Sequence, residues 1–200
     1  MQRQRRIGLT GGIASGKSSV GRLLEARGWP VLDADRYARD ALAPNTPSSE
    51  AVVERFGATV GSASNLDRKA LGRIVFNDSV ERRWLEDLIH PVVRDRFDQE
   101  LDALGGEPVV VLMIPLLFEA GLESLCSEIW VVDCTPEQQL ARMMQRDGLS
   151  EAEAQARLLA QWPLTRKRDL ADVVIDNGGG PNELAAAVNR CVQLAHGTTS

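Results

Sequence analysis

The residues best suited to chemistry lie near the start of the chain, in residues 7–20 (IGLTGGIASGKSSV). Gly11, Gly16, Lys17 and Ser18 follow the spacing G-x-x-x-x-G-K-[ST] of a phosphate-binding loop. Glycines let backbone N–H groups approach phosphate oxygens, and the helix expected next points the positive end of its dipole at the same place. In such a loop the lysine reaches the β- and γ-phosphates, and the serine hydroxyl ligates Mg²⁺. The segment therefore predicts a nucleoside triphosphate site.

The setting of this loop supports the interpretation. A short apolar strand, Ile7–Leu9, leads into the glycine-rich turn, and helix formers follow it. A match of this kind arises by chance in about one random chain of this size in a hundred, before the strand–turn–helix context is required. The residues expected around the phosphates of the nucleotide are Gly11, Gly12, Ile13, Ala14, Ser15, Gly16, Lys17, Ser18 and Ser19, with Ser18 as the Mg²⁺ ligand.

Two carboxylates, Asp33 and Asp35, follow a second short strand, Val31–Leu32. A carboxylate at the C-terminal end of a strand lies on the edge where open α/β sheets bind ligands. There it could accept a proton or arrange Mg²⁺. One of the two is expected to cap the next helix, residues 36–42. Asp33 is nearer to the strand and is favoured for function, which leaves Asp35 for the cap.

Arg142 and Arg146 lie four residues apart on one face of a helix that the sequence Thr135–Gln138 is expected to begin. A second capped helix follows, and then a basic cluster at residues 166–168. A helix pair that carries arginines opposite a phosphate loop is typical of a lid that closes over triphosphate charge. The alternative is a solvated arginine face paired with nearby acids. The lid is favoured because phosphoryl transfer needs cations around the transferred group.

The segment 37–104 predicts helices and no strand. Within it, Pro91 disfavours helical geometry at His90 and removes a backbone hydrogen bond, so a kink or a break is expected there. His90 could contact a ligand or lie in the core. The core role is favoured because this histidine borders an apolar helix face.

Six consecutive apolar residues, 109–114, predict a strand buried on both faces of a parallel sheet. Leu116, Leu117 and Phe118 follow at its C-terminal end, on the ligand edge. These three side chains fit core packing and a pocket for an apolar or aromatic substrate group about equally well. Further strands are expected at residues 129–133 and 173–175.

Composition narrows the possible functions. The 200 residues carry a net charge of −5, which argues against general affinity for nucleic acid. The longest apolar run, Val109–Phe118, is too short for a membrane span, and the basic start lacks an apolar signal-peptide core. Cys126, Cys134 and Cys191 form no metal-type pair and read as inert thiols of a reducing cytosol. A cytoplasmic enzyme with neither a nucleic-acid nor a membrane partner is expected, and its oligomeric state stays open.

Taken together, these elements resemble the dephospho-CoA kinase family. The resemblance covers nearly the whole chain, to about residue 190, and its Asp-Ala-Asp, His-Pro and Ile-Asp-Asn elements are much more specific than the phosphate loop. The matching pieces, in the family's order, are Gly8–Ser18, Asp33–Asp35 with Arg39, Leu66–Arg68 with Leu71 and Phe76, His90-Pro91, Pro115–Leu117 with Glu119, Gln139–Arg142 with Arg146-Asp147, and Val174–Asn177.

The resemblance implies transfer of the γ-phosphoryl group of ATP to the ribose 3′-hydroxyl of dephospho-CoA, with Mg²⁺, as the last step of coenzyme A synthesis. It implies a P-loop NTPase α/β fold with a five-stranded parallel sheet flanked by helices. The nucleotide-binding core would comprise residues 1–36, 105–135 and 169–200. Residues 37–104 would form a helical substrate-binding domain, and residues 136–168 a lid.

Roles follow from the same resemblance, position by position. Asp33 would be the base on the 3′-hydroxyl, while Lys17 and Ser18 would handle phosphates and Mg²⁺. The residues assigned to the lid are Arg142 and Arg146, the residue near the adenine is Asn177, and those facing the coenzyme are Arg39, His90, Leu116, Leu117 and Phe118.

Two departures from the family pattern are visible. Ala14 replaces a frequent glycine, which is tolerable if the residue keeps a negative φ. Arg36 and Tyr37 stand where apolar residues are common. Three other functions remain possible: another P-loop small-molecule kinase acting on a nucleoside, nucleotide or sugar acid, a switch GTPase, or a non-catalytic ATP-binding module. The GTPase is disfavoured because the chain lacks an Asn-Lys-x-Asp guanine signature.

Overall fold

The structure is a computed structural model that describes the backbone of residues 4–197 and the side chains of residues 4–193. The chain divides into two compact units, one formed by residues 1–32 with 104–200 and the other by residues 33–103. No helix in the described range is long and apolar enough to cross a membrane.

The first unit is built on a five-stranded sheet with the order β2-β5-β1-β6-β7. Its strands are β1 (Arg5–Gly11), β2 (Val31–Asp33), β5 (Val109–Met113), β6 (Glu128–Asp133) and β7 (Val173–Asp176). Strand β1 pairs in parallel with both β5 and β6, so that Ile7 lies between Val111 and Glu128, and β6 pairs in parallel with β7. The predicted α/β fold with a five-stranded parallel sheet is confirmed. Asp33, the last residue of β2, is also the first residue of the second unit.

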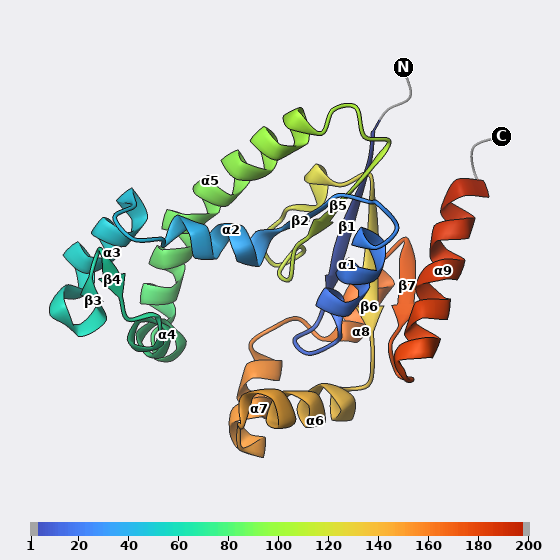
Figure 1. Cartoon of the computed structure of the whole chain (residues 1–200). Coiled ribbons are helices and arrows are strands. Elements are labelled where there is room, and N and C mark those ends of the chain that lie inside the picture. Colours follow the sequence, from blue (N-terminus) through green and yellow to red (C-terminus); the bar gives the residue numbers. More distant parts are fainter. Residues whose placement is uncertain (1–3, 198–200) are drawn as a thin grey trace. The chain divides into compact units, whose positions relative to one another are not determined.

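The helices of the first unit are α1 (Lys17–Glu25), α6 (Pro136–Asp147), α7 (Glu151–Leu159), α8 (Leu164–Asp169) and α9 (Pro181–Gly197), with a 3₁₀ turn at Glu123–Leu125. Helices α6 and α7 begin where the local sequence predicts, whereas α8 was not expected. Capping boxes at Thr135 and Ser150 start α6 and α7, because each hydroxyl accepts an N–H bond that the first turn cannot make internally. Helices α1 and α9 lie side by side against the sheet, whereas α8 packs on β6 (Figure 1).

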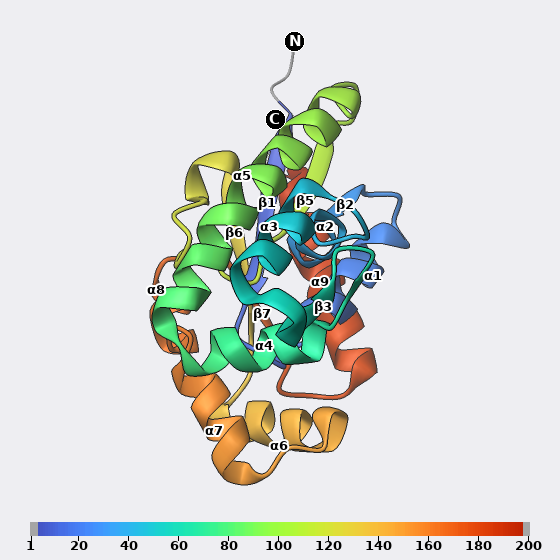
Figure 2. The ribbon, with the colours of Figure 1, turned by 90° about the vertical axis from the view of Figure 1, so that its left-hand side faces the viewer.

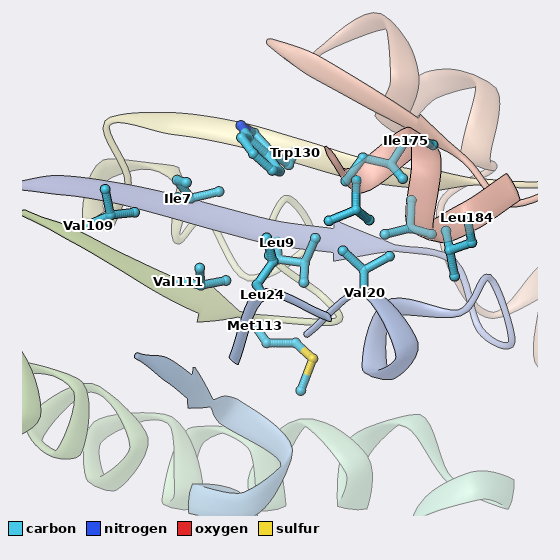
Figure 3. Close-up of a cluster of buried hydrophobic side chains, with 13 residues drawn as sticks. Ile7, Leu9, Val20, Leu24, Val109, Val111, Met113, Trp130, Ile175 and Leu184 are labelled. Atoms are coloured by element: carbon cyan, nitrogen blue, oxygen red, sulfur yellow. The ribbon is translucent and has the colours of Figure 1, made fainter. Parts of the chain in front are cut away.

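The main core lies between the sheet and the α1–α9 pair. Alternate residues of each strand face these helices, as a period of two requires. Figure 3 shows that Ile7, Leu9, Val111 and Trp130 from three adjacent strands belong to one buried cluster with Leu24 of α1. On the opposite face, a Cβ at Gly8 would lie 2.6 Å from Cys126 Sγ and 2.7 Å from Leu117 Cδ1, so the chain after β5 covers that side. All five residues of β5 are buried, as its unbroken apolar run predicts.

The second unit is mainly helical. Its helices are α2 (Ala34–Ala41), α3 (Pro47–Phe56), α4 (Arg68–Asn77) and α5 (Ser79–Ala103), with a 3₁₀ turn at Gly57–Val60. A short antiparallel hairpin, β3 (Gly61–Ser62) and β4 (Asn65–Leu66), corrects the expectation that this segment contains no strand. Helices α3 and α4 and the hairpin gather at one end of α5, while α2 packs across α5 (Figures 1 and 2).

Helix α5 runs unbroken through Pro91, so the sequence prediction of a kink or a break is wrong as to the break. Ile89, Val93, Phe97 and Leu101 are buried at helical spacing on both sides of the proline. One missing backbone hydrogen bond costs less than exposing this stripe would, so packing holds the helix continuous.

Candidate active site

The phosphate loop connects β1 to α1 in the first unit, and two of its glycines are required by geometry. Gly11 has φ 156° and Gly16 has φ 101°, both in the region that favours glycine. A Cβ at Gly11 would lie 2.6 Å from Ser15 Oγ and 2.7 Å from the Val132 carbonyl oxygen. A Cβ at Gly16 would collide with the Asn177 side-chain amide. Neighbouring protein atoms therefore exclude a larger residue at both positions.

Ala14 departs from the sequence expectation, because its φ is +57° and not negative. The left-handed conformation brings Cβ close to the following carbonyl oxygen and costs an alanine about 1–2 kcal/mol relative to the right-handed one. The surrounding loop fixes this backbone from outside, and the strain is the consequence of placing alanine where glycine fits.

Side chains from distant segments hold the loop in shape. Gln139 Nε2 donates to the Ile13 carbonyl oxygen at 2.7 Å, and the Ile13 N–H donates to Gln161 Oε1 at 2.9 Å. Asn177 Nδ2, buried, donates to the Ser15 carbonyl oxygen at 2.7 Å. The segment of the predicted lid and the residue after β7 thus hold the loop by hydrogen bonds. Neither glutamine was assigned this role from the sequence, because an amide that meets a loop more than 100 residues away leaves no local pattern.

The groups that would meet phosphate are present in this loop. Lys17 Nζ donates to the Gly11 carbonyl oxygen at 3.5 Å, which places the ammonium over the loop. Ser15 Oγ is buried and has no hydrogen-bond partner in the described part of the chain. The Ser18 hydroxyl belongs to an exposed residue in the first turn of α1, where helix N–H groups are unsatisfied. This donor set fits a polyphosphate, and the Ser18 oxygen suits Mg²⁺.

The two arginines of the predicted lid differ in their surroundings. Arg142 Nη2 donates to the Asn177 carbonyl oxygen at 2.7 Å, and its Nη1 lies 3.5 Å from the carbonyl oxygens of Ala14 and Ser15. Arg146 is exposed and forms a two-pronged ion pair with Asp147, at 2.8 and 2.9 Å. The hydrogen bonds of this pair lower the pKa of the Asp147 carboxyl and raise the pKa of the Arg146 guanidinium. Arg142 therefore joins the phosphate loop, and Arg146 does not contact it.

In the second unit, the capping assignment of the two aspartates is reversed. Asp33, not Asp35, is the N-cap of α2, and its Oδ1 accepts the Asp35 N–H at 2.9 Å. The helix begins at Ala34, earlier than expected, which moves the cap back to the strand end. The other oxygen, Oδ2, makes no hydrogen bond with the described residues, so the cap orients one oxygen and leaves the second available.

The residues expected to face the coenzyme are not alike. His90 is exposed, so the favoured core role was wrong: the apolar stripe of α5 runs through its neighbour Ile89. In the first unit, Leu117 is fully buried and Phe118 nearly so, which supports core packing for both. Leu116 is 37% exposed, so a ligand could reach its side chain but not the side chains of Leu117 and Phe118.

A buried ion pair is the main feature that sequence reasoning missed. Lys167 of α8 is fully buried, and its Nζ lies 2.7 Å from Glu119 Oε1 and 3.3 Å from the Pro115 carbonyl oxygen. Glu119 Oε1 also accepts the Trp162 N–H at 3.1 Å, and the Trp162 and Phe118 rings stack with centroids 6.3 Å apart. The pair ties the end of the predicted lid to the loop after β5. In the sequence, Lys167 belongs to the basic cluster 166–168, which is equally compatible with a solvent-exposed surface.

The other two cations of that cluster also have partners. Arg168 pairs with Asp133 at 3.1 Å, and the Arg166 guanidinium lies 3.3 Å from the centre of the Trp162 ring.

The three cysteines fit the prediction of inert thiols. Burial raises the pKa of each thiol, and that of Cys126 reaches about 12.

The sheet order and the loop after β1 define the class: this is a P-loop α/β kinase fold with a helical unit inserted after β2. Residues 5–183 match the family model for dephospho-CoA kinase. A dephospho-CoA kinase of Parasynechococcus marenigrum strain WH8102 is 76% identical over 196 residues, 98% of this chain and 99% of the relative. The chain belongs to the dephospho-CoA kinase family, as the sequence resemblance predicted.

Solved structures agree with this placement. A protein of Thermus thermophilus is 37% identical and superposes with a TM-score of 0.84, covering 99% of both chains. A dephospho-CoA kinase from Campylobacter jejuni is 29% identical with a TM-score of 0.72, covering 97% of this chain and 98% of that one. The likeness extends over both units, so the family match is not confined to the phosphate loop.

Proposed function

We propose that this kinase transfers the γ-phosphoryl group of ATP to the 3′-hydroxyl of the ribose of dephospho-CoA and releases coenzyme A and ADP. The observation that carries the proposal is an intact phosphate loop in a chain matched to the family over residues 5–183. A cytoplasmic location is part of the proposal, supported by three free cysteines, which a reducing compartment maintains.

The ATP side of the reaction would be served by the first unit. Loop N–H groups and the Lys17 ammonium would bind the β- and γ-phosphates, and Ser15 Oγ would find there the partner that it lacks. Arg142 lies against the loop and the Asn177 carbonyl, which suits a guanidinium that faces the nucleotide. Bound Mg²⁺, with Ser18 as its protein ligand, would neutralise charge on the phosphates.

The acceptor side would be served by Asp33. Its Oδ1 is held by the Asp35 N–H, so the Oδ2 atom would take the hydrogen bond, and then the proton, of the attacking hydroxyl. The transition state of phosphoryl transfer is loose, so the proton leaves late and orientation of the oxygen matters most. The γ-phosphorus–oxygen bond to ADP breaks as the bond to the ribose oxygen forms.

A coupled assay of ADP release tests this directly. Purified protein is supplied with ATP, Mg²⁺ and one acceptor at a time: dephospho-CoA, adenosine, AMP or gluconate. Rapid ADP release with dephospho-CoA alone is expected, and a preference for any other acceptor would replace the proposed reaction by that of another small-molecule kinase.

Two variants separate the roles. Lys17→Ala is expected to lose turnover and weaken ATP binding, because it removes the loop's ammonium. Asp33→Asn is expected to lose at least a hundredfold in kcat while ATP binding, measured by calorimetry, stays within about twofold. Asparagine can still cap α2, so folding is preserved. Full activity of Asp33→Asn would remove the base from the mechanism.

A further inference from the structure

The buried ion pair between Lys167 and Glu119 takes no part in the chemistry proposed above. Lys167 is fully buried and Glu119 is mostly buried. Replacing such a pair by apolar side chains of similar volume is often neutral or stabilising, because the two charges then need not be removed from water. Glu119 Oε2 is moreover buried without a hydrogen-bond partner in the described part of the chain. The stability of the fold therefore gives no reason for an ion pair here.

One contact of the pair fixes the linker between α7 and α8, residues 160–163. The Trp162 N–H donates to Glu119 Oε1 at 3.1 Å, and the same oxygen lies 2.7 Å from Lys167 Nζ. Gln161 precedes Trp162, and its Oε1 accepts the Ile13 N–H of the phosphate loop at 2.9 Å. Because the Trp162 N–H and the Gln161 Cα belong to one planar peptide group, the bond to Glu119 also places Gln161. The carboxylate thus sets the position from which Gln161 reaches the loop.

A second contact of the pair reaches the start of the loop. Lys167 Nζ donates to the Pro115 carbonyl oxygen at 3.3 Å, and that oxygen also accepts the Thr10 hydroxyl at 3.1 Å. Thr10 is fully buried and immediately precedes Gly11, the first glycine of the motif. The ion pair is therefore linked to the loop on two sides, through Pro115 at its start and through the linker at Ile13.

Helix α8 also packs against the loop directly. A Cβ at Gly12 would lie 3.1 Å from Leu164 Cγ, so this leucine lies next to the loop backbone. Leu164 and Lys167 are both buried and three residues apart, which places them on one face of the helix. The face of α8 that bears the buried ammonium is therefore the face that meets the phosphate loop.

From these contacts we infer that Lys167 and Glu119 are positioning residues for ATP: they hold Gln161 where it fixes the Ile13 peptide. The inference rests on the proposed function in one respect, that ATP binds at this loop. Gln139 Nε2 donates to the Ile13 carbonyl oxygen at 2.7 Å, so side chains hold both backbone polar groups of this residue. A loop held in its binding conformation loses less conformational entropy when a ligand binds. Release of Gln161 should therefore weaken ATP.

The first test compares two double variants that both remove the ion pair. In Lys167→Met/Glu119→Gln the new amide oxygen still accepts the Trp162 N–H, whereas in Lys167→Met/Glu119→Leu nothing replaces that acceptor. Calorimetry on the full-length protein should give an ATP affinity within about twofold of wild type for the glutamine variant. The leucine variant should bind ATP about three- to tenfold more weakly, the range for one hydrogen bond. Equal ATP affinities of the two variants would overturn the inference.

A double-mutant cycle tests whether the pair acts through Gln161. Gln161→Leu removes the bond to Ile13 directly and should weaken ATP by a similar factor. Added to Lys167→Met/Glu119→Leu, it should weaken ATP by less than about twofold more, because residues of one hydrogen-bond network do not contribute independently. Losses that multiply would show that the ion pair does not act through Gln161, and the positioning role would fall.

Arg168→Met is the matched control on the same helix. It removes an ion pair with Asp133 in which the arginine side chain is about half exposed, and ATP affinity should stay within about twofold of wild type. A loss as large as that of Lys167→Met/Glu119→Leu would show that any charge removed from α8 weakens ATP, which contradicts a specific role of the buried pair.

Binding and turnover separate this inference from the proposed reaction. If the variants show the expected pattern of ATP affinity but the wild type does not phosphorylate dephospho-CoA, the positioning role stands and the reaction fails. If dephospho-CoA is phosphorylated but the two double variants bind ATP equally, the reaction stands and the positioning role is wrong.

Discussion

Removal of the Lys167 ammonium should lower the free energy of unfolding by an amount that follows directly from the contacts of this side chain. Lys167 is fully buried and 2.7 Å from Glu119 Oε1, with a second bond to the Pro115 carbonyl oxygen. In Lys167→Met the apolar stem is replaced at nearly equal length, so little packing is lost. The Glu119 carboxylate then keeps a single donor, the Trp162 N–H, while its Oε2 is already buried without a partner.

The expected cost follows from that geometry. Breaking a buried ion pair by removing one partner costs about 3–5 kcal/mol, because the remaining charge stays desolvated. The Glu119 side chain is 17% exposed, so water relieves part of the penalty and the lower end, about 3 kcal/mol, is expected. For a chain of this size, each kcal/mol lowers Tm by about 2–4 °C, which gives a loss of roughly 6–12 °C.

Urea unfolding and thermal melts followed by circular dichroism measure this loss. Arg168→Met is the matched control on the same helix: its ion pair with Asp133 is 3.1 Å long, but the arginine side chain is 51% exposed. Such surface pairs contribute about 0–1 kcal/mol. The double variant Lys167→Met/Glu119→Leu should recover most of the stability, since it leaves no buried charge. A Lys167→Met loss no larger than that of Arg168→Met would refute the argument.

Two further predictions concern the phosphate loop and the cysteines. Ala14→Gly removes the strain of a φ of +57° from the folded protein, but glycine also makes the unfolded chain more flexible, which opposes folding. The net effect expected in urea unfolding is a stabilisation of about 0.5–1 kcal/mol, with ATP binding retained. Unchanged or lower stability would show that the loop carries no strain at this residue. Burial raises the pKa of Cys126 from 9.0 to about 12, so its contribution to stability is full below pH 9 and is lost between pH 9 and 12. Unfolding at stepped pH should show this alkaline loss in the wild type and a smaller one in Cys126→Ala, and iodoacetamide at pH 8 should label Cys126 only after unfolding.

Local chemistry explains what the sequence predicted well. The phosphate loop is a contiguous motif, and its spacing fixes where glycines, lysine and serine fall on the turn into α1. Strand β5 is a continuous apolar run, and the caps of α6 and α7 lie within four residues of the N–H groups that they satisfy. Each of these features depends on residues that are close in the sequence, so it can be predicted from the sequence alone.

Interactions between distant residues explain the misses. The stripe buried on both sides of Pro91 keeps α5 continuous, although the local rule predicts a break. The loop around Ala14 sets its positive φ, and a two-residue shift in the start of α2 makes Asp33 the cap. At Pro91 and at Ala14 the surrounding structure outweighs a local preference of about 1–3 kcal/mol.

The sequence by itself thus determined the family, the sheet and the phosphate loop of this protein. The tertiary structure decided which charges are buried, as for Lys167 and Glu119, and that Asp33 is the residue that caps α2. The reason is physical: a side chain's type and spacing are written along the chain, whereas its desolvation depends on segments that meet only after folding.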